Sequence, residues 1–311
     1  MPKATDATSD SNNRADCLTF AWWNTSLAPT GNSRNCQTLR GHAADIITYL
    51  LHEKNVDFIA LGEMGDEDLT FLMSLPELED FKSVSGFSKI KRSKFDTCYI
   101  FNPTKLSVVG TQNITYAHGS STLKVAQKVE ILEFSAPTSI TVFASHWPSR
   151  LWCSENSTDR HALGLGLRRE IDSAIAESAS PPHIILMGDY NDEPFAASIS
   201  EQLMATRDYK FVQKNSHLLY NPFWNCMGHG TSHSKPFAGS YYYKGGKYTK
   251  WHTFDQIIYS HAFVAAKAWR LCDSEAHLSD IPDLLEKLES KEIHIDHIPV
   301  LGKIVRTAQN V

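Results

Sequence analysis

The chain has 311 residues, of which 42% are hydrophobic, enough for one large core or two smaller ones. Its formal charge of −5 excludes a general attraction for polyanions, although a local basic patch can still bind one. The cysteines form no CxxC pair, no apolar stretch approaches the ~20 residues of a membrane span, and residues 1–16 lack a signal-peptide core. We therefore expect a reduced, cytoplasmic protein without a membrane segment; secreted disulfides are an unsupported alternative.

Residues 1–16 are polar and almost free of large apolar side chains, which predicts a disordered tail. From Cys17 onward, no Pro/Gly/Ser-rich linker separates two parts of the chain, and no internal repeat is present. The sequence therefore predicts one domain over residues 17–311.

Runs of β-branched and other apolar residues predict strands along this domain. They cover residues 18–23, 58–61, 97–101, 124–134, 140–145, 183–187, 254–259, 263–271 and 298–304. Helical patterns occupy residues 43–51, 162–176 and 282–288, the last with proline in its first turn. Many strands with a few helices between them predict an α/β fold of two packed sheets flanked by helices.

Polar clusters stand at the ends of several of these strands. A strand core has no use for carboxylates, amides or imidazoles, because their uncompensated burial is costly. For any single cluster a turn is the alternative, since Gly-Asp and Asn-Asp are common turn pairs. The clusters are Trp22-Trp23-Asn24, Ile59–Glu63, Phe143–Arg150, Met187–Asn191, and Phe254–Ile257 together with Asp296-His297.

In this order, N…E…H…GDxN…D…DH, the clusters resemble the endonuclease/exonuclease/phosphatase superfamily, the deoxyribonuclease-I-like fold. The resemblance covers residues 17–304. It implies a four-layer α/β/β/α sandwich, in which two packed mixed sheets are flanked by helices and the active site lies at one end of the sheets. It also implies hydrolysis of phosphoesters, without fixing the substrate.

The resemblance assigns Glu63 and Asp296 to a divalent metal, with an amide oxygen from Asn24 nearby. Carboxylate and amide oxygens are hard ligands suited to Mg²⁺ or Mn²⁺. The alternatives are a capped strand end or a surface salt bridge for Glu63, and a turn for Asn24.

The same resemblance assigns the chemical step. Asp189 would orient or deprotonate the attacking water, and Asn191 would hold water or phosphate beside it. His297 would donate to a phosphate oxygen, with its tautomer fixed by Asp255. His146 would contact the phosphate from the opposite wall. The alternatives are a buried acid bonded to backbone for Asp255 and a structural histidine for His146.

The segment His146–Arg150 (HWPSR) resembles that of bacterial-type members, which makes Trp147 and Arg150 candidate substrate contacts. A guanidinium matches phosphate with two parallel hydrogen bonds. Gly62, Ser145 and Ile295 stand where the family commonly has Gln, Asn and Ser. These departures put in doubt how neighbouring residues adjust the site, but not the reaction itself.

Residues 235–252 mix lysines with aromatic side chains and contain no acid. Such a composition suits a surface that follows a phosphate backbone and stacks bases, so Tyr243, Lys244 and Lys247 are candidate nucleic-acid contacts. An edge hairpin turning at Gly245-Gly246 explains the same residues. A nuclease for DNA or RNA is the preferred function. The alternatives are a hydrolase of small or lipid phosphate esters and a non-catalytic binding module; protein partners stay open.

Overall fold

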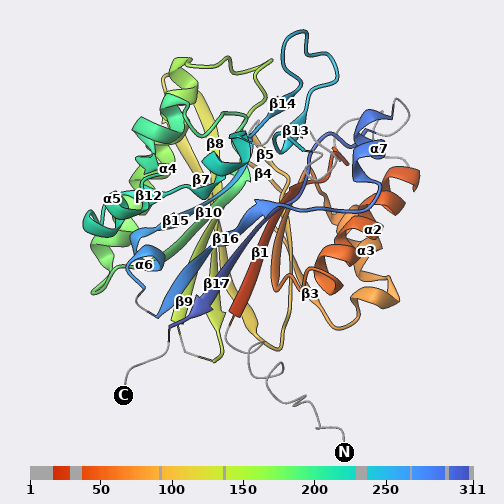
Figure 1. The fold of residues 1–311 in the computed structure, drawn as a ribbon, viewed down its shortest axis with the longest axis horizontal. Coiled ribbons are helices and arrows are strands. Elements are labelled where there is room, and N and C mark those ends of the chain that lie inside the picture. The colour runs from red at the N-terminus through yellow and green to blue at the C-terminus, as the bar shows by residue number, and fades with distance from the viewer. Residues whose placement is uncertain are drawn as a thin grey trace, which may run out of the picture.

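The computed structural model describes residues 17–28, 37–90, 93–135, 138–228, 237–266, 268–290 and 294–307. Two large mixed sheets pack face to face in these residues, and helices cover their outer faces (Figure 1). This arrangement confirms the predicted four-layer α/β sandwich. The predicted tail, residues 1–16, lies outside the described residues.

The first sheet has six strands in the order β16-β17-β1-β2-β6-β3. Its central strand β1 runs parallel to β2 and antiparallel to β17. In sheet order the strands are Trp269–Leu278, Val300–Arg306, Cys17–Asn24, Phe58–Gly62, Cys98–Phe101 and Lys82–Ser85.

The second sheet has seven strands in the order β11-β12-β15-β10-β9-β8-β7. Its strand β10 runs parallel to β9 and antiparallel to β15. In sheet order the strands are Ala205–Thr206, Leu219–Tyr220, Asp255–Ser260, His183–Asp189, Thr138–His146, Ser121–Glu133 and Leu106–His118.

Two small hairpins and several helices complete the described fold. One hairpin pairs β13 (Tyr241–Tyr242) with β14 (Trp251–His252), and the other pairs β4 (Ser88–Ile90) with β5 (Ser93–Phe95). The helices are α2 (Gln37–His52), α3 (Asp66–Met73), α4 (Thr158–Glu177), α5 (Tyr209–Lys214), α6 (His261–Val264) and α7 (Leu284–Glu289), with short helical turns at Pro76–Leu78, Ser198–Gln202 and Pro222–Gly228.

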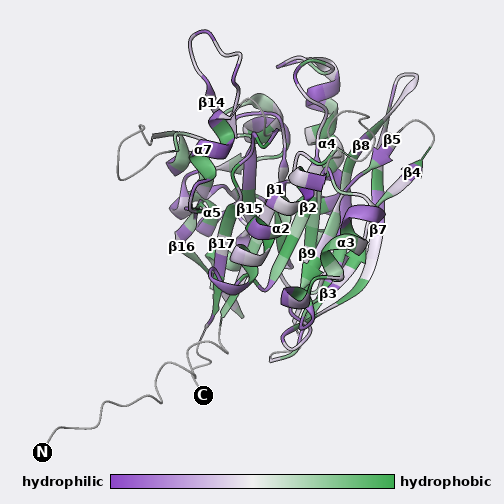
Figure 2. Cartoon of the chain, turned by 90° about the vertical axis from the view of Figure 1, so that its right-hand side faces the viewer, coloured by the Kyte–Doolittle hydropathy of each residue, from purple (hydrophilic) through white to green (hydrophobic). Residues whose placement is uncertain are grey.

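The side chains of β1 point alternately to its two faces, and this shows how the layers form. Phe20 and Trp22 face the second sheet and join the core between the sheets, whereas Ala21 and Trp23 face the layer that contains α2. Side chains on a strand point alternately to its two faces, so one strand serves both layers. Hydrophobic residues accordingly concentrate in the central strands (Figure 2).

The predicted strand at residues 263–271 is wrong. Residues 261–264 form the helix α6, and the strand β16 begins only at Trp269. Ala262, Phe263 and Val264 are all buried, so a single helical turn buries the same apolar run that a strand would. A short apolar run cannot be assigned from periodicity alone, which explains the error.

Candidate active site

The polar clusters meet at one end of the sandwich because strands of both sheets deliver them there. Asp189 ends β10 and lies opposite His146 of β9 on one side and Asp255 of β15 on the other. In the first sheet, Asn24 ends β1 beside Gly62, and Glu63 follows directly. The predicted catalytic and metal-binding residues therefore come from neighbouring strand ends.

The backbone at these strand ends is constrained. Glu63 and Asn191 have φ angles of 54° and 51°, in the left-handed region that disfavours side chains other than glycine. Such conformations cost about 1–3 kcal/mol each and persist where the surrounding fold imposes them. A Cβ atom on Gly188 would lie 2.1 Å from the carbonyl oxygen of Ser145, so only glycine lets β9 and β10 approach here.

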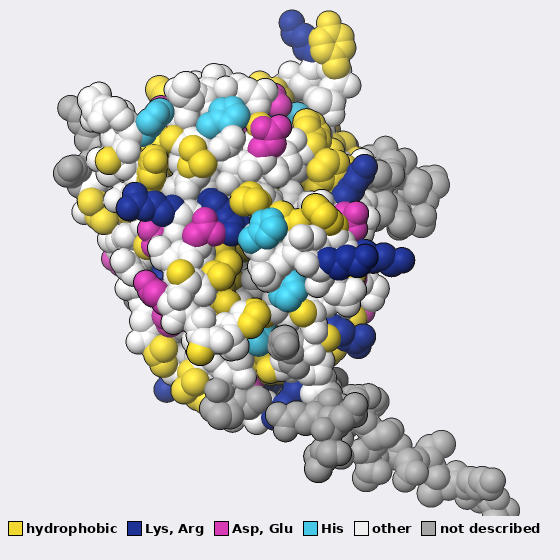
Figure 3. Space-filling model, turned by 90° about the vertical axis from the view of Figure 1, so that its left-hand side faces the viewer, with side chains coloured by type: hydrophobic (Ala, Val, Ile, Leu, Met, Phe, Trp, Pro, Cys, Tyr) yellow, Lys and Arg dark blue, Asp and Glu magenta, His cyan; other side chains and the backbone are white. Residues whose placement is uncertain are grey.

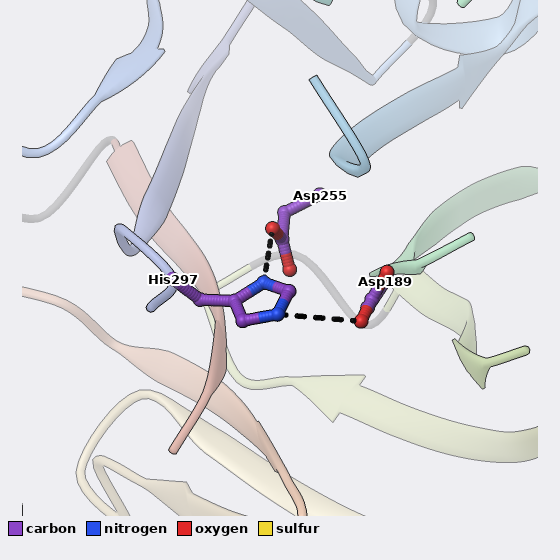
Figure 4. A group of neighbouring side chains, drawn as sticks. All are labelled: Asp189, Asp255 and His297. Carbon is purple, nitrogen blue, oxygen red and sulfur yellow. Dashed lines mark hydrogen bonds and ion pairs between the residues drawn. The ribbon is translucent and has the colours of Figure 1, made fainter. Parts of the chain in front are cut away.

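His297 is held by a buried carboxylate. Its Nδ1 lies 2.7 Å from Oδ2 of Asp255, whose other oxygen accepts a 2.8 Å bond from Nε1 of Trp22. Nε2 of His297 points to Asp189, with 3.7 Å to Oδ2 (Figure 4). Burial alone lowers the pKa of His297, but the carboxylates of Asp255 and Asp189 outweigh it and raise the pKa to about 10. The two carboxylates therefore favour the protonated form of the imidazole.

His146 forms a second histidine–aspartate pair on the opposite wall. Its Nδ1 lies 3.2 Å from Oδ1 of Asp96, which also pairs with Lys124 at 2.8 Å. Burial lowers the pKa of His146, but the charge of Asp96 outweighs it and raises the pKa overall. The sequence analysis missed Asp96 and Lys124; the sole local signal was an acid directly before the predicted strand 97–101.

The side chains around Glu63 fit a divalent cation. Oε2 of Glu63 is buried without a hydrogen-bond partner, and burial raises the pKa of this carboxyl group. A buried oxygen without a donor is costly unless a cation or water binds it. Asn24 donates from Nδ2 to both carboxylates, at 3.4 Å to Oε1 of Glu63 and 3.2 Å to Oδ2 of Asp189, while its Oδ1 accepts a 3.1 Å bond from the backbone N–H of Ser26. The amide oxygen predicted to face the metal is therefore turned to the backbone. The negative charge of Asp296 also acts on Glu63.

A second group of possible ligand atoms belongs to Asp189, Asp255 and His297, which lie within 4.8 Å of one another among the described residues. Both oxygens of Asp255 already accept hydrogen bonds, from Trp22 and His297. Asp255 therefore has no unbonded oxygen to offer a metal, and the Glu63 side of the site fits a metal better.

The prediction that Trp147 contacts substrate is wrong. Its side chain has no exposed surface, and Nε1 donates to the carbonyl oxygen of Val125. The ring packs edge-on against Tyr190 in the layer beneath the sheet. Trp147 does hold the site indirectly, because its carbonyl oxygen accepts a 3.0 Å bond from Nδ2 of Asn191.

Arg150 lies beside the site at Asn191. Its Nε donates to the carbonyl oxygen of Asn191 at 3.0 Å, and its terminal nitrogens face Glu155 and Asp192. The guanidinium stacks 4.6 Å from the centre of the Phe254 ring. Arg150 is thus placed next to a predicted catalytic residue, and its contact with phosphate stays a prediction.

The predicted hairpin is present between residues 241 and 252, whereas Lys235 lies outside the described residues. Tyr241 forms a β-bridge with His297 and its ring lies 4.7 Å from the imidazole, while the backbone N–H of Tyr242 donates to Asp296. The hairpin therefore borders the site directly. Tyr243, Lys244 and Lys247 are exposed beyond it, and the tip extends into solvent (Figure 3).

A sandwich of two mixed sheets, with carboxylates and imidazoles gathered at one end, defines a class of α/β phosphoester hydrolases. The sequence profile of the Endonuclease/Exonuclease/phosphatase family matches residues 34–296, so the chain belongs to this family. No match was found among proteins of curated function.

Solved structures share this fold at low sequence identity. The catalytic domain of human Nocturnin, with bound sulfate, is 15% identical with a TM-score of 0.61, covering 94% of this chain and 95% of Nocturnin's. A mannosyl-6-phosphatase of Bacteroides thetaiotaomicron is 13% identical with a TM-score of 0.60, over 93% and 99%. D. rerio TDP2, complexed with single-strand DNA product, is 16% identical with a TM-score of 0.59, over 93% and 98%. These likenesses show the fold alone.

No helix in the described parts of the chain is both long and apolar enough to cross a membrane.

Proposed function

We propose that this protein is a divalent-metal-dependent nuclease that uses Mg²⁺ or Mn²⁺ to hydrolyse phosphodiester bonds in DNA or RNA. The observation that carries the substrate class is the attachment of the Tyr/Lys hairpin to the catalytic end of the fold. Tyr241 packs on His297, and Tyr242 is bonded to the backbone of Asp296. A polymer lying across the site would therefore also lie against this hairpin, whose aromatic faces and lysines suit nucleic acid.

Three side chains of this chain perform the chemical step in the proposed mechanism. Asp189 accepts the proton of the attacking water, and the backbone N–H of Asn191 fixes the other oxygen of Asp189 at 2.9 Å. His297, held as a cation by Asp255, donates from Nε2 to a phosphate oxygen as negative charge develops there. His146 binds the phosphate from the opposite wall.

Glu63 and Asp296 would hold the metal, and Asn24 links Glu63 to Asp189 beside them. The bound cation supplies a Lewis acid that neutralises charge on the phosphoryl group. The Oε2 atom of Glu63, which has no hydrogen-bond partner, supports this assignment.

We also propose that the protein is cytoplasmic. The described cysteines are free, which is consistent with that compartment.

A substrate panel tests the proposal. Supercoiled plasmid, single-stranded DNA, RNA, a chromogenic phosphodiester and phosphomonoesters are each incubated with Mg²⁺, Mn²⁺ or EDTA. We expect cleavage of a nucleic acid with either metal and none with EDTA. Full activity in EDTA after chelator dialysis would overturn metal dependence, and rapid turnover of phosphomonoesters without nucleic-acid cleavage would favour a phosphatase.

Glu63→Ala tests the metal site and should lower turnover while leaving the fold intact. The matched control is Glu67→Ala, because Glu67 is an exposed acid on the neighbouring helix α3. Isothermal titration with Mn²⁺ gives a readout independent of activity. Equal Mn²⁺ affinity in the wild type and in Glu63→Ala would remove Glu63 from the metal site.

The hairpin lysines are tested by the double variant Lys244→Gln/Lys247→Gln. If these lysines bind phosphates, the variant should show a flatter salt dependence of binding, because fewer counterions are released. Lys210→Gln/Lys214→Gln on α5 is the matched control at another exposed site. An unchanged salt slope in the hairpin variant would exclude these lysines as phosphate ligands.

A further inference from the structure

The most exposed apolar side chains of the described chain lie near the active site. Among the large hydrophobic residues, Tyr248 is 102% exposed, Leu151 90% and Trp152 89%, whereas the next, Val109, is 64%. Tryptophan and tyrosine offer large apolar faces whose burial against a partner is favourable, and they are enriched at interfaces. The location of these three residues is therefore informative.

They belong to two segments that border the site at different points. Leu151 and Trp152 follow Arg150, which is bonded to Asn191, whereas Tyr248 is at the tip of the hairpin whose base contacts His297. Both segments, the loop before α4 and the hairpin of β13 and β14, project from the end of the sandwich opposite the termini (Figures 1 and 2). A nucleic-acid strand bound at the catalytic residues would thus meet one of these two segments on each side.

A row of stacked planar groups joins the two segments. The guanidinium of Arg150 lies on Phe254, whose ring stacks on Tyr241 at 5.3 Å and 18°. Tyr241 in turn stacks on the half-exposed Tyr243 at 6.4 Å and 19°. Phe254 is buried between Arg150 and Tyr241, so this row fixes the loop and the hairpin relative to each other, and Tyr243 at its end keeps an exposed face.

Exposed aromatic faces distinguish single-stranded from double-stranded nucleic acid. An aromatic side chain stacks on a base only where the base is not already covered by its neighbours, as in single strands. Single strands and duplexes both need basic side chains for the phosphate backbone, but only a single strand leaves base faces open to stacking. The exposed aromatic faces of Trp152 and Tyr248 therefore favour unpaired bases.

We propose that Trp152 and Tyr248 stack unpaired bases on the two sides of the phosphodiester that is cleaved, so that the protein acts on single-stranded rather than duplex nucleic acid. This inference rests on the proposed nuclease function. It adds a substrate form and a pair of contacts that the lysine-rich hairpin alone does not define.

Binding measurements without turnover test the stacking contacts. Fluorescence anisotropy in EDTA compares a labelled single strand with a blunt hairpin duplex, using the wild type, Trp152→Ala, Tyr248→Ala and the double variant. Each single change should weaken single-strand binding at least about fivefold, the lower range for loss of one stacked base, and leave duplex binding nearly unchanged. Trp152→Phe should restore most of the affinity, because it restores a stacking face.

Phe211→Ala is the matched control, since Phe211 is a half-exposed aromatic residue on α5, away from both segments. Single-strand affinity that is equal in the wild type and the double variant would overturn the inference. Binding to vesicles of phosphatidylcholine and phosphatidylserine is measured with the same proteins. If Trp152→Ala abolishes vesicle binding and leaves oligonucleotide affinity unchanged, the surface contacts lipid instead.

The cleavage assay separates this inference from the proposed function. If the wild type cleaves single strands and duplexes equally well and the variants match it, the stacking inference fails and the nuclease stands. If no polynucleotide is cleaved or bound while phosphomonoesters are hydrolysed, both fail together.

Discussion

The two histidine–aspartate pairs of the active site differ in how they are isolated from water. Asp255 has no exposed surface, lies 2.7 Å from His297, and is fixed by Trp22. The side chain of Asp96 is 19% exposed, lies 3.2 Å from His146, and is shared with Lys124. Water can replace a side chain removed from the second pair, whereas removal from the first leaves a buried polar group unsatisfied. The same two residue types therefore form one rigid pair and one adjustable pair.

The largest effect is expected at the rigid pair and the carboxylate it faces. His297→Ala and Asp189→Asn should each lower kcat at least ~10²-fold, because a phosphate donor or a general base is removed. Turnover of a small chromogenic phosphodiester at saturating Mg²⁺ measures this, with circular dichroism to verify folding. A well-folded variant that keeps the wild-type kcat would remove that residue from the chemical step.

Asp255→Asn should lower kcat by about 10²-fold, because an amide no longer fixes the donor orientation of His297. The effect acts through His297, so the double variant Asp255→Asn/His297→Ala should lose clearly less than the product of the two single losses. A double-mutant cycle in kcat provides the measurement. Strict additivity would mean that Asp255 does not orient His297.

Asp96→Asn should have a smaller effect, about tenfold in kcat, in the lower range for a group that orients an active-site histidine. The surface pair His118–Asp159, at 2.7 Å, offers a matched control, and Asp159→Asn should leave kcat unchanged. If Asp96→Asn costs as much as Asp255→Asn, then the two pairs are equally rigid and the proposed difference between them is wrong.

The smallest effect concerns a buried histidine without a carboxylate. His183, at the start of β10, packs edge-on against Phe263, and burial lowers its pKa to about 4. Between pH 6.5 and 4 the unfolded chain binds a proton there that the folded chain excludes. The free energy of unfolding should therefore fall as pH falls through this window, by up to about 1.4 kcal/mol per pH unit.

Urea unfolding at pH 7 and pH 5 measures this slope. His183→Gln should make the loss of stability at pH 5 smaller, whereas His217→Gln, at an exposed histidine, should leave it unchanged. Identical pH dependence in the wild type and in His183→Gln would show that His183 is not the source.

Sequence reasoning located the parts of the site that local patterns define. Asp189 and His297 follow or precede apolar strands in short motifs, so their position at strand ends could be predicted. Asp96 and Lys124 could not, because their meeting with His146 depends on three segments that only the folded sheets bring together. Trp147 was misassigned because the residue after His146 turns to the opposite face, where it is buried.

The fold was predictable for a related reason. The core strands β1 and β10 contain the apolar runs Phe20–Trp23 and Ile184–Met187, and burial on both faces imposes that pattern. The long edge strand β7 was missed because most of its side chains are half-buried or exposed and form no continuous apolar run. Edge strands are specified by their pairing partner more than by their own residues.

Gly188 sets a limit on how this enzyme can be re-engineered. The backbones of β9 and β10 approach so closely at Gly188 that any Cβ there would collide with Ser145. The separation of the backbones at Asp189 and His146 is therefore set by the pairing of the two strands. Substitution of side chains cannot widen it. A library that varies the residues around the site should therefore keep position 188 constant.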